Sequence, residues 1–249
     1  VLHRMRALGA ALVRAAVRAD PHGNRGRRRY SLGRTTMVGA GLEAAASDAV
    51  CAVLEEAWGS DRFSVQCIGG DFSLPGAEKQ DLHADVPARD IARQLFLHRG
   101  PANPSVAFME LPLPAVKVYF PLVDLDDTTG PPRFLPGSHK RTAFEDVPPP
   151  EQEPPTVLSY CPAGSALLMD QRVWHGGTPN LSQGVRPMLS AHYAGPGYSE
   201  GVLADGGTIP FFGTYYWCYH RALARRAPAP TARPRWPTAA PRCRASAAL

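Results

Sequence analysis

Three residues of the chain have the types and the spacing of a metal site. His83 and Asp85 are separated by a single residue, and His175 lies much further along the chain. Two neutral imidazoles and one carboxylate on one side of an Fe(II) ion leave coordination positions open for a co-substrate and dioxygen, and this ligand set is typical of non-haem iron oxygenases. We therefore predict that His83, Asp85 and His175 bind iron.

A fourth residue has the chemistry to bind the co-substrate. Arg186 follows His175 by 186 − 175 = 11 residues. Its planar guanidinium is always charged and suits bidentate binding of a carboxylate. We therefore expect Arg186 to hold the distal carboxylate of a dicarboxylic acid such as 2-oxoglutarate.

The expected strands explain how these residues are brought together. Side chains at positions i and i+2 of a strand point to the same side of the sheet, so a strand through residues 83–85 directs both ligands at one metal. The alternation of residues 116–120 predicts a further strand, with Tyr119 and Lys117 on the face opposite the apolar residues. His192 is six residues beyond Arg186 on the same expected strand face. It is a candidate for the pocket lining, with a structural role as the alternative.

The remaining pattern predicts a mainly β protein with helices at its edge. Many short strands separated by Gly/Pro turns favour a sandwich or a barrel. Residues 41–58 have apolar residues at helical spacing, followed by Gly59 in a position typical of a helix end. We expect one amphipathic helix there, packed on the outside of a sheet.

The charge of the chain is distributed unevenly. Residues 1–36 contain nine Arg and one Asp, and residues 221–249 contain seven Arg and no acidic residue. Residues 37–220 contain 11 basic and 21 acidic residues, a net charge of 11 − 21 = −10. A nucleic-acid reader is expected to have its basic patch on the folded domain. The pI of about 9.1 is therefore no argument for a nucleic-acid partner.

We expect one catalytic domain over residues 37–220. Residues 1–36 are Ala- and Arg-rich and are interpreted either as a targeting segment for organelle import or as an unstructured extension. The Pro/Ala/Arg-rich residues 221–249 are expected to be disordered. The five Cys show no zinc spacing and have an odd count, which favours reduced thiols and an intracellular, by default cytoplasmic, location. No apolar run is long enough to span a membrane.

Four segments resemble, in their order, those of the phytanoyl-CoA dioxygenase family of Fe(II)/2-oxoglutarate oxygenases. They are Gln80-x-x-His83-x-Asp85, the Gly/Pro-rich residues 130–140, residues 164–170, and Trp174-His175-Gly176 running on to Arg186. Several spaced motifs agree, which makes the resemblance far more specific than one short motif. It covers roughly residues 60–195 and neither end of the chain.

The resemblance implies a double-stranded β-helix of jelly-roll type with flanking α-helices. It also implies that 2-oxoglutarate binds the iron through its 2-oxo acid end while Arg186 holds the other carboxylate. Dioxygen would then be consumed and 2-oxoglutarate decarboxylated to succinate, as an unactivated C–H bond of a small molecule, a lipid or a specialised metabolite, is hydroxylated. Ascorbate is expected to support turnover, and the protein to be a monomer or a homodimer.

One departure from the family pattern concerns a second contact to 2-oxoglutarate. Members of the family often have a small hydroxyl residue two positions after the distal histidine, whereas this chain has Gly177 there. Thr178 and Tyr119 are the candidates to replace that contact.

Two other functions remain open at this point. A metal-binding jelly roll without turnover, acting as a sensor or scaffold, would need the triad but not Arg186. An oxygenase that repairs nucleic acid would need basic residues on the domain, and the acidic centre of the chain disfavours it.

Overall fold

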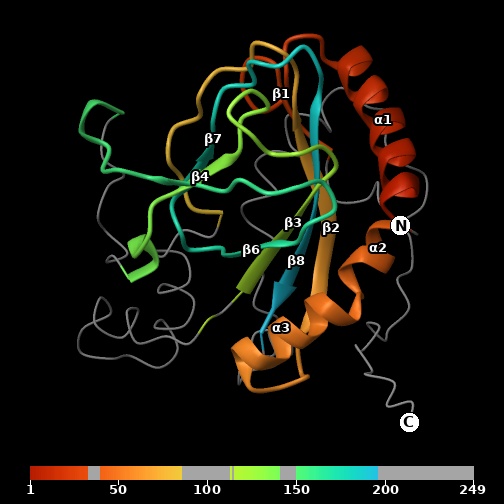
Figure 1. Cartoon of the computed structure of the whole chain (residues 1–249), viewed down its shortest axis with the longest axis vertical. Helices are drawn as coiled ribbons and strands as arrows, with labels where there is room; N and C mark the ends of the chain where they lie inside the picture. Colours follow the sequence, from red (N-terminus) through yellow and green to blue (C-terminus); the bar gives the residue numbers. More distant parts are fainter. Residues whose placement is uncertain (33–39, 86–112, 114, 141–149, 196–249) are drawn as a thin grey trace, which may run out of the picture.

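Two antiparallel sheets form the body of the molecule (Figure 1). The computed structural model describes residues 1–32, 40–85, 113, 115–140 and 150–195. The larger sheet has the order β1-β2-β8-β3-β6, with β1 Arg29–Ser31, β2 Ser64–Ser73, β8 Arg186–Ala194, β3 Ala115–Pro121 and β6 Leu167–Asp170. The smaller has the order β5-β4-β7, with β5 Val157–Leu158, β4 Pro132–Phe134 and β7 His175–Gly177. The prediction of a mainly β fold is confirmed.

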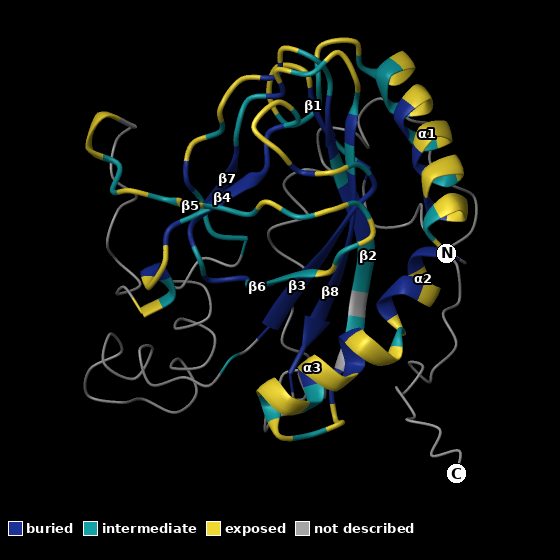
Figure 2. Ribbon diagram, viewed as in Figure 1, coloured by how far each residue is buried: buried dark blue, intermediate teal, exposed yellow. Residues whose placement is uncertain are grey.

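Three α-helices lie along one side of the five-stranded sheet (Figure 1). They are α1 Leu2–Ala19, α2 Ala40–Ala45 and α3 Asp48–Trp58, and two short 3-10 helices occupy Ser138–Lys140 and Pro150–Gln152. The helices are exposed on their outer faces and buried where they meet the sheet (Figure 2). The main hydrophobic core is therefore the layer between these helices and the sheet.

The central strands β3 and β8 separate this core from the opposite face of the sheet. Val116, Val118 and Phe120 of β3 pack in the core, as do Leu189, Ala191 and Tyr193 of β8. Because side chains alternate along a strand, the remaining residues of both strands face the other way. Tyr119 accordingly belongs to a second apolar cluster, as the strand prediction for residues 116–120 required.

The predicted helix over residues 41–58 is two helices. Ser47 has extended backbone angles (φ −67, ψ 140) and separates α2 from α3. Serine is favoured at such a position because it competes for backbone hydrogen bonds, and its hydroxyl donates to the carbonyl of Ala44. The predicted end is confirmed, since Gly59 adopts left-handed angles (φ 61, ψ 25) as the C-cap.

The expectation that residues 1–36 lie outside the domain is corrected for residues 1–32. The apolar face of α1 packs against the core, with Met5 and Val13 buried. Tyr30 of β1 is 1% exposed and stacks on Phe72 of β2 at 4.6 Å. Composition suggested an extension because Ala and Arg dominate it, but one helical face and one short strand supply enough apolar surface to join the core.

The structure also bears on the expectations for the cysteines and for membrane-spanning segments, but not on those for the C-terminal end of the domain. Cys67 and Cys161 are free thiols, whereas Cys51 is disulfide-bonded, which corrects the expectation of reduced thiols for that residue. Among the helices in the described part of the chain, none has the length and apolar character needed to cross a bilayer. The domain limit at residue 220 and the tail 221–249 fall outside the described residues and stay predictions.

Candidate metal centre and pocket

The three predicted metal ligands lie together. His83, Asp85 and His175 each offer one ligand atom, and these atoms lie within 4.8 Å of one another. His175 Nε2 is 3.7 Å from Asp85 Oδ1. His175 is 4% exposed, and the Asp85 side chain is 10% exposed. Within the described residues, this is the one group of three such side chains close enough to hold a metal ion.

Backbone pairing sets the separation of the two histidines. His83 and His175 form an isolated antiparallel bridge, in which each backbone N–H donates to the other's carbonyl, at 2.9 Å and 2.8 Å. The expected regular strand through residues 83–85 is therefore reduced to a single bridge, and Asp85 lies in a bend. The bridge holds the imidazole rings 4.5 Å apart, centroid to centroid, without a longer strand.

Both imidazoles are oriented with Nε2 available. Nδ1 of His83 lies 3.1 Å from the carbonyl of Asp81, and Nδ1 of His175 lies 2.9 Å from that of Val173. A ligating histidine commonly donates its other N–H to such a carbonyl. Burial lowers the pKa of His175 to about 3 and also lowers that of His83. Both rings are therefore neutral at pH 7, as metal binding requires.

Two basic residues keep Asp85 ionised. Lys117 Nζ donates to Asp85 Oδ2 at 2.8 Å, and Arg25 lies 3.9 Å from Asp85 Oδ1. Burial by itself raises the pKa of Asp85, but the charge of Lys117, supported by that of Arg25, helps to hold the pKa well below the ordinary value. Arg25 also pairs with Asp71 at 2.7 Å. The third candidate ligand is thus an ionised carboxylate, held in place by its contacts with Lys117 and Arg25.

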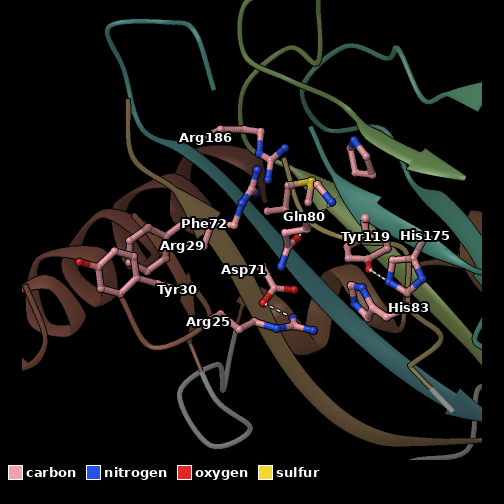
Figure 3. A pocket seen from close by; sticks show the side chains of 14 residues that line it. Arg25, Arg29, Tyr30, Asp71, Phe72, Gln80, His83, Tyr119, His175 and Arg186 are labelled. Atoms are coloured by element: carbon pink, nitrogen blue, oxygen red, sulfur yellow. Dashed lines mark hydrogen bonds and ion pairs between the residues drawn. The ribbon is translucent and has the colours of Figure 1, made fainter. Parts of the chain in front are cut away.

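Arg186 lies at the other end of the same pocket (Figure 3). It is 2% exposed, and its guanidinium donates to the carbonyl of Gly130. Its Nε has no hydrogen-bond partner, and burial lowers its pKa to about 10, so that it is still charged at pH 7. A buried guanidinium with unused donors suits an anionic ligand.

The other predicted site residues are placed differently. Tyr119 lines the pocket, with its hydroxyl 3.5 Å from His175 Nε2, and burial raises its pKa to about 12. Thr178 is not among the lining residues, and its hydroxyl donates to the carbonyl of Pro131 at 2.6 Å. His192 is buried and is not among the lining residues, and its Nδ1 lies 3.4 Å from Gln171 Oε1. Of the two interpretations given for His192, this arrangement favours the structural role.

Sequence reasoning missed the contribution of the N-terminal segment. Arg25 and Arg29 both line the pocket, although they belong to the stretch that was expected to lie outside the domain. No motif marks them, because their role depends on the pairing of β1 with β2. The one available signal was the alternation of the apolar residues Tyr30 and Leu32 after an arginine-rich run, and this pattern is too short to predict a strand.

The pocket lies between the two sheets. Arg29, Tyr119 and Met188 come from the larger sheet, and Pro132 and Gly176 from the smaller. The triad, of which His83 and His175 line the pocket, fits an Fe(II) ion, because the donor set is two neutral imidazoles and one carboxylate. The pocket also fits a dicarboxylic co-substrate, because Arg186 lines it and the Nε of this side chain has no hydrogen-bond partner.

Relatives among curated proteins are dioxygenases by name. Dioxygenase af480 of Aspergillus fumigatus is 27% identical over 143 residues, which are 55% of this chain and 39% of that protein. Dioxygenase cdmA of Talaromyces verruculosus is 30% identical over 115 residues, 46% of this chain and 34% of that protein. This chain therefore matches less than two fifths of the length of either relative.

Solved structures share the fold. EvdMO1 superposes with a TM-score of 0.57 at 18% identity, covering 78% of this chain and 44% of that one. The epimerase SnoN, in complex with Fe3+, alpha ketoglutarate and nogalamycin RO, superposes with a TM-score of 0.50 at 19% identity, covering 84% and 82%. With the two antiparallel sheets, these matches confirm the predicted double-stranded β-helix. The family model for phytanoyl-CoA dioxygenase (PhyH) matches residues 3–188, and the chain belongs to this family.

Proposed function

We propose that this chain is an Fe(II)/2-oxoglutarate-dependent oxygenase. His83, Asp85 and His175 bind the iron, and Arg186 binds the distal carboxylate of 2-oxoglutarate. Two observations carry the proposal: the three ligand atoms lie within 4.8 Å of one another, and the buried Arg186 lines the same pocket as His83 and His175. A scaffold that only binds metal has no need of the arginine.

The metal supplies the chemistry, and the chain supplies geometry. Ferrous iron, with 2-oxoglutarate and dioxygen, provides the oxidising power that breaks an unactivated C–H bond. The His83–His175 bridge holds two ligands at a set separation, and Lys117 holds Asp85 as a carboxylate. Arg186 orients the co-substrate from the opposite end. The burial of these side chains limits access of water to the reacting groups.

The expected outcome is hydroxylation of a small molecule, a lipid or a specialised metabolite. Membership of the family and the names of the dioxygenase relatives support this class of reaction. Residues 1–220, which include the N-terminal segment, contain 9 + 11 = 20 basic and 1 + 21 = 22 acidic residues, and this lack of a basic excess supports a partner other than nucleic acid. In this proposal residues 1–32 belong to the catalytic domain, and residues 221–249 do not.

Formation of succinate tests the proposal. The purified protein is supplied with Fe(II) and 2-oxoglutarate and screened against a library of lipids and specialised metabolites, with and without ascorbate. Succinate produced in proportion to a hydroxylated product is the expected result, with ascorbate prolonging turnover. Binding of Fe(II) without any binding of 2-oxoglutarate would contradict the proposal and favour the sensor or scaffold.

A further inference from the structure

Two ion pairs meet beside the proposed iron ligand Asp85. Arg25 Nη1 donates to Asp71 Oδ1 at 2.7 Å, and Lys117 Nζ donates to Asp85 Oδ2 at 2.8 Å. Longer contacts join the two pairs, from Lys117 Nζ to Asp71 Oδ2 at 3.8 Å and from Arg25 Nη2 to Asp85 Oδ1 at 3.9 Å. We call these two cations and two carboxylates the charge ring.

Distant segments of the chain supply the charge ring. Arg25 lies between α1 and β1, Asp71 is on β2 and Lys117 is on β3. The exposed fractions of the Arg25, Asp71, Lys117 and Asp85 side chains are 20%, 19%, 2% and 10%. Figure 3 shows Arg25 and Asp71 directed at each other, and both line the pocket. Because water screens such charges poorly, each of them acts strongly on the others.

The two oxygens of Asp85 have different surroundings. Lys117 holds Oδ2, whereas Oδ1 is the atom that lies 3.7 Å from His175 Nε2. Oδ1 is therefore the oxygen that faces the histidine ligand atoms and is available to a metal. Arg25 Nη2 is 3.9 Å from the same oxygen, which is beyond hydrogen-bond distance.

Asp71 accounts for that distance. Its carboxylate accepts the direct hydrogen bond from Arg25, and the guanidinium is thereby held back from Asp85. Burial by itself raises the pKa of Asp71, but the charges of Arg25 and Lys117 hold it below the ordinary value, so that Asp71 is ionised at pH 7. Without this charge, Asp85 would be the one carboxylate of the charge ring left for two cations.

We propose that Asp71 is a positioning residue for the iron site, which keeps Arg25 and its positive charge away from the metal-binding oxygen of Asp85. A cation next to that oxygen would compete with a divalent metal for it. This inference rests on the proposed function, because it concerns the affinity for the proposed iron. It also couples the N-terminal segment to the metal site through Arg25.

Titration of the full chain with Mn(II) tests the role of Asp71 without turnover. Free Mn(II) is measured by electron paramagnetic resonance at each step. Asp71→Asn keeps the size of the side chain and removes its charge. It should lower the affinity for Mn(II) by about 10- to 100-fold, as is typical when a residue that orients a metal ligand is lost. An unchanged affinity in Asp71→Asn would overturn the inference.

A second substitution separates positioning from a general structural role. Arg25→Gln in the Asp71→Asn protein removes the excess positive charge, so the affinity for Mn(II) should return to within about threefold of the wild type. Arg25→Gln alone should lower the affinity by no more than about threefold. Losses that add in the double variant would overturn the inference. So would a loss in Arg25→Gln alone of about tenfold or more, a result that decides the matter even if Asp71→Asn does not fold.

A matched control comes from another buried pair. Asp170 pairs with Arg172 at 2.6 Å, their side chains are 13% and 5% exposed, and neither residue lines the pocket. Asp170→Asn should bind Mn(II) as the wild type does. A wild type that binds no Mn(II) would contradict the proposed function, and the inference with it.

Discussion

The two ends of the pocket are built in different ways. At the metal end, a backbone bridge joins His83 to His175, and Asp85 is two residues from His83. At the arginine end, Arg29 and Arg186 come from opposite ends of the domain and meet because β2 pairs with both β1 and β8. Local spacing positions the proposed metal ligands, whereas sheet topology brings the two arginines together. A short motif therefore reveals the first end but not all of the second.

Removal of residues 1–32 should have the largest effect, because it deletes one side of the arginine end and part of the core. Met5, Val13, Tyr30 and Leu32 are buried. At about 1.5–3 kcal/mol for each buried side chain, the loss is roughly 6–12 kcal/mol, comparable to the stability of a whole domain. The shortened chain should lack a cooperative melting transition by circular dichroism.

The matched control removes residues 221–249, which are predicted to lie outside the domain. That variant should melt as the full chain does. If the chain lacking residues 1–32 also melts like the full chain, the domain begins near residue 37 and the arginine end does not depend on β1.

His175→Ala should abolish metal binding and leave the arginine end of the pocket unchanged. Loss of one of three protein ligands should remove stoichiometric Fe(II) binding, measured by metal analysis after gel filtration. His192→Gln is the matched control, because His192 is also buried but lies outside the pocket lining. Stoichiometric Fe(II) in His175→Ala, with unchanged affinity, would show that the triad is not the iron site.

Arg186→Ala should have the reciprocal effect. Removing one partner of a buried charge pair costs about 2–5 kcal/mol, which is about 30- to 4,000-fold in 2-oxoglutarate affinity. Fe(II) binding should be nearly intact, because the metal ligands are untouched. Arg186→Lys should recover part of the loss, since it keeps the charge but lacks the planar fork. Calorimetry with Mn(II) separates the two affinities, and an unchanged 2-oxoglutarate affinity in Arg186→Ala would remove the arginine from the site.

Glu153→Gln should have the smallest effect, because it changes an ion pair outside the pocket lining. Glu153 accepts from Arg133 at 2.6 Å and 3.0 Å, and from Lys79 at 2.5 Å. The Arg133 hydrogen bonds lower the pKa of Glu153 from 4.5 to about 2. Because the folded-state pKa is lower, this stabilisation is complete above pH 4.5 and is lost as the pH falls towards 2.

Thermal melts at several pH values measure this contribution. At pH 7 Glu153→Gln should lower the melting temperature by roughly 2–4 °C, and the difference from the wild type should shrink below pH 4.5. Glu78→Gln is the control, because its carboxylate is 70% exposed and pairs only with the exposed Arg27 among the recorded ion pairs of the described residues. A difference that persists at pH 2 would mean that the charge of Glu153 is not the cause.

The sequence predicted the metal end well for a physical reason. A metal site needs particular donor atoms, and few residue types supply them, so the types and spacing of His83, Asp85 and His175 limit the interpretations. The strand of Tyr119 was also predicted, because alternation of apolar residues follows directly from strand geometry. The break at Ser47 was not, since helical spacing continues across it.

The arginine end was predicted only through Arg186. Arg29 lies in a run of arginines whose members are alike in type, and only the fold distinguishes it from the exposed Arg27. The hydroxyl of Thr178 was assigned to the pocket because of its place after Gly177, but it donates to the carbonyl of Pro131 instead. Such contacts depend on long-range pairing, which no local pattern encodes.

The position of β8 in the larger sheet has a consequence for folding. β8 is the last strand of the described chain, yet it lies between β2 and β3 and pairs with both. During synthesis the edges of β2 and β3 stay unpaired until residues 186–194 have emerged, and unpaired edges favour aggregation. Because the closing contacts span most of the domain, we expect slow folding in a late step. Insertion of that strand also brings Arg186 beside Arg29, so the arginine end of the pocket forms only when the sheet closes.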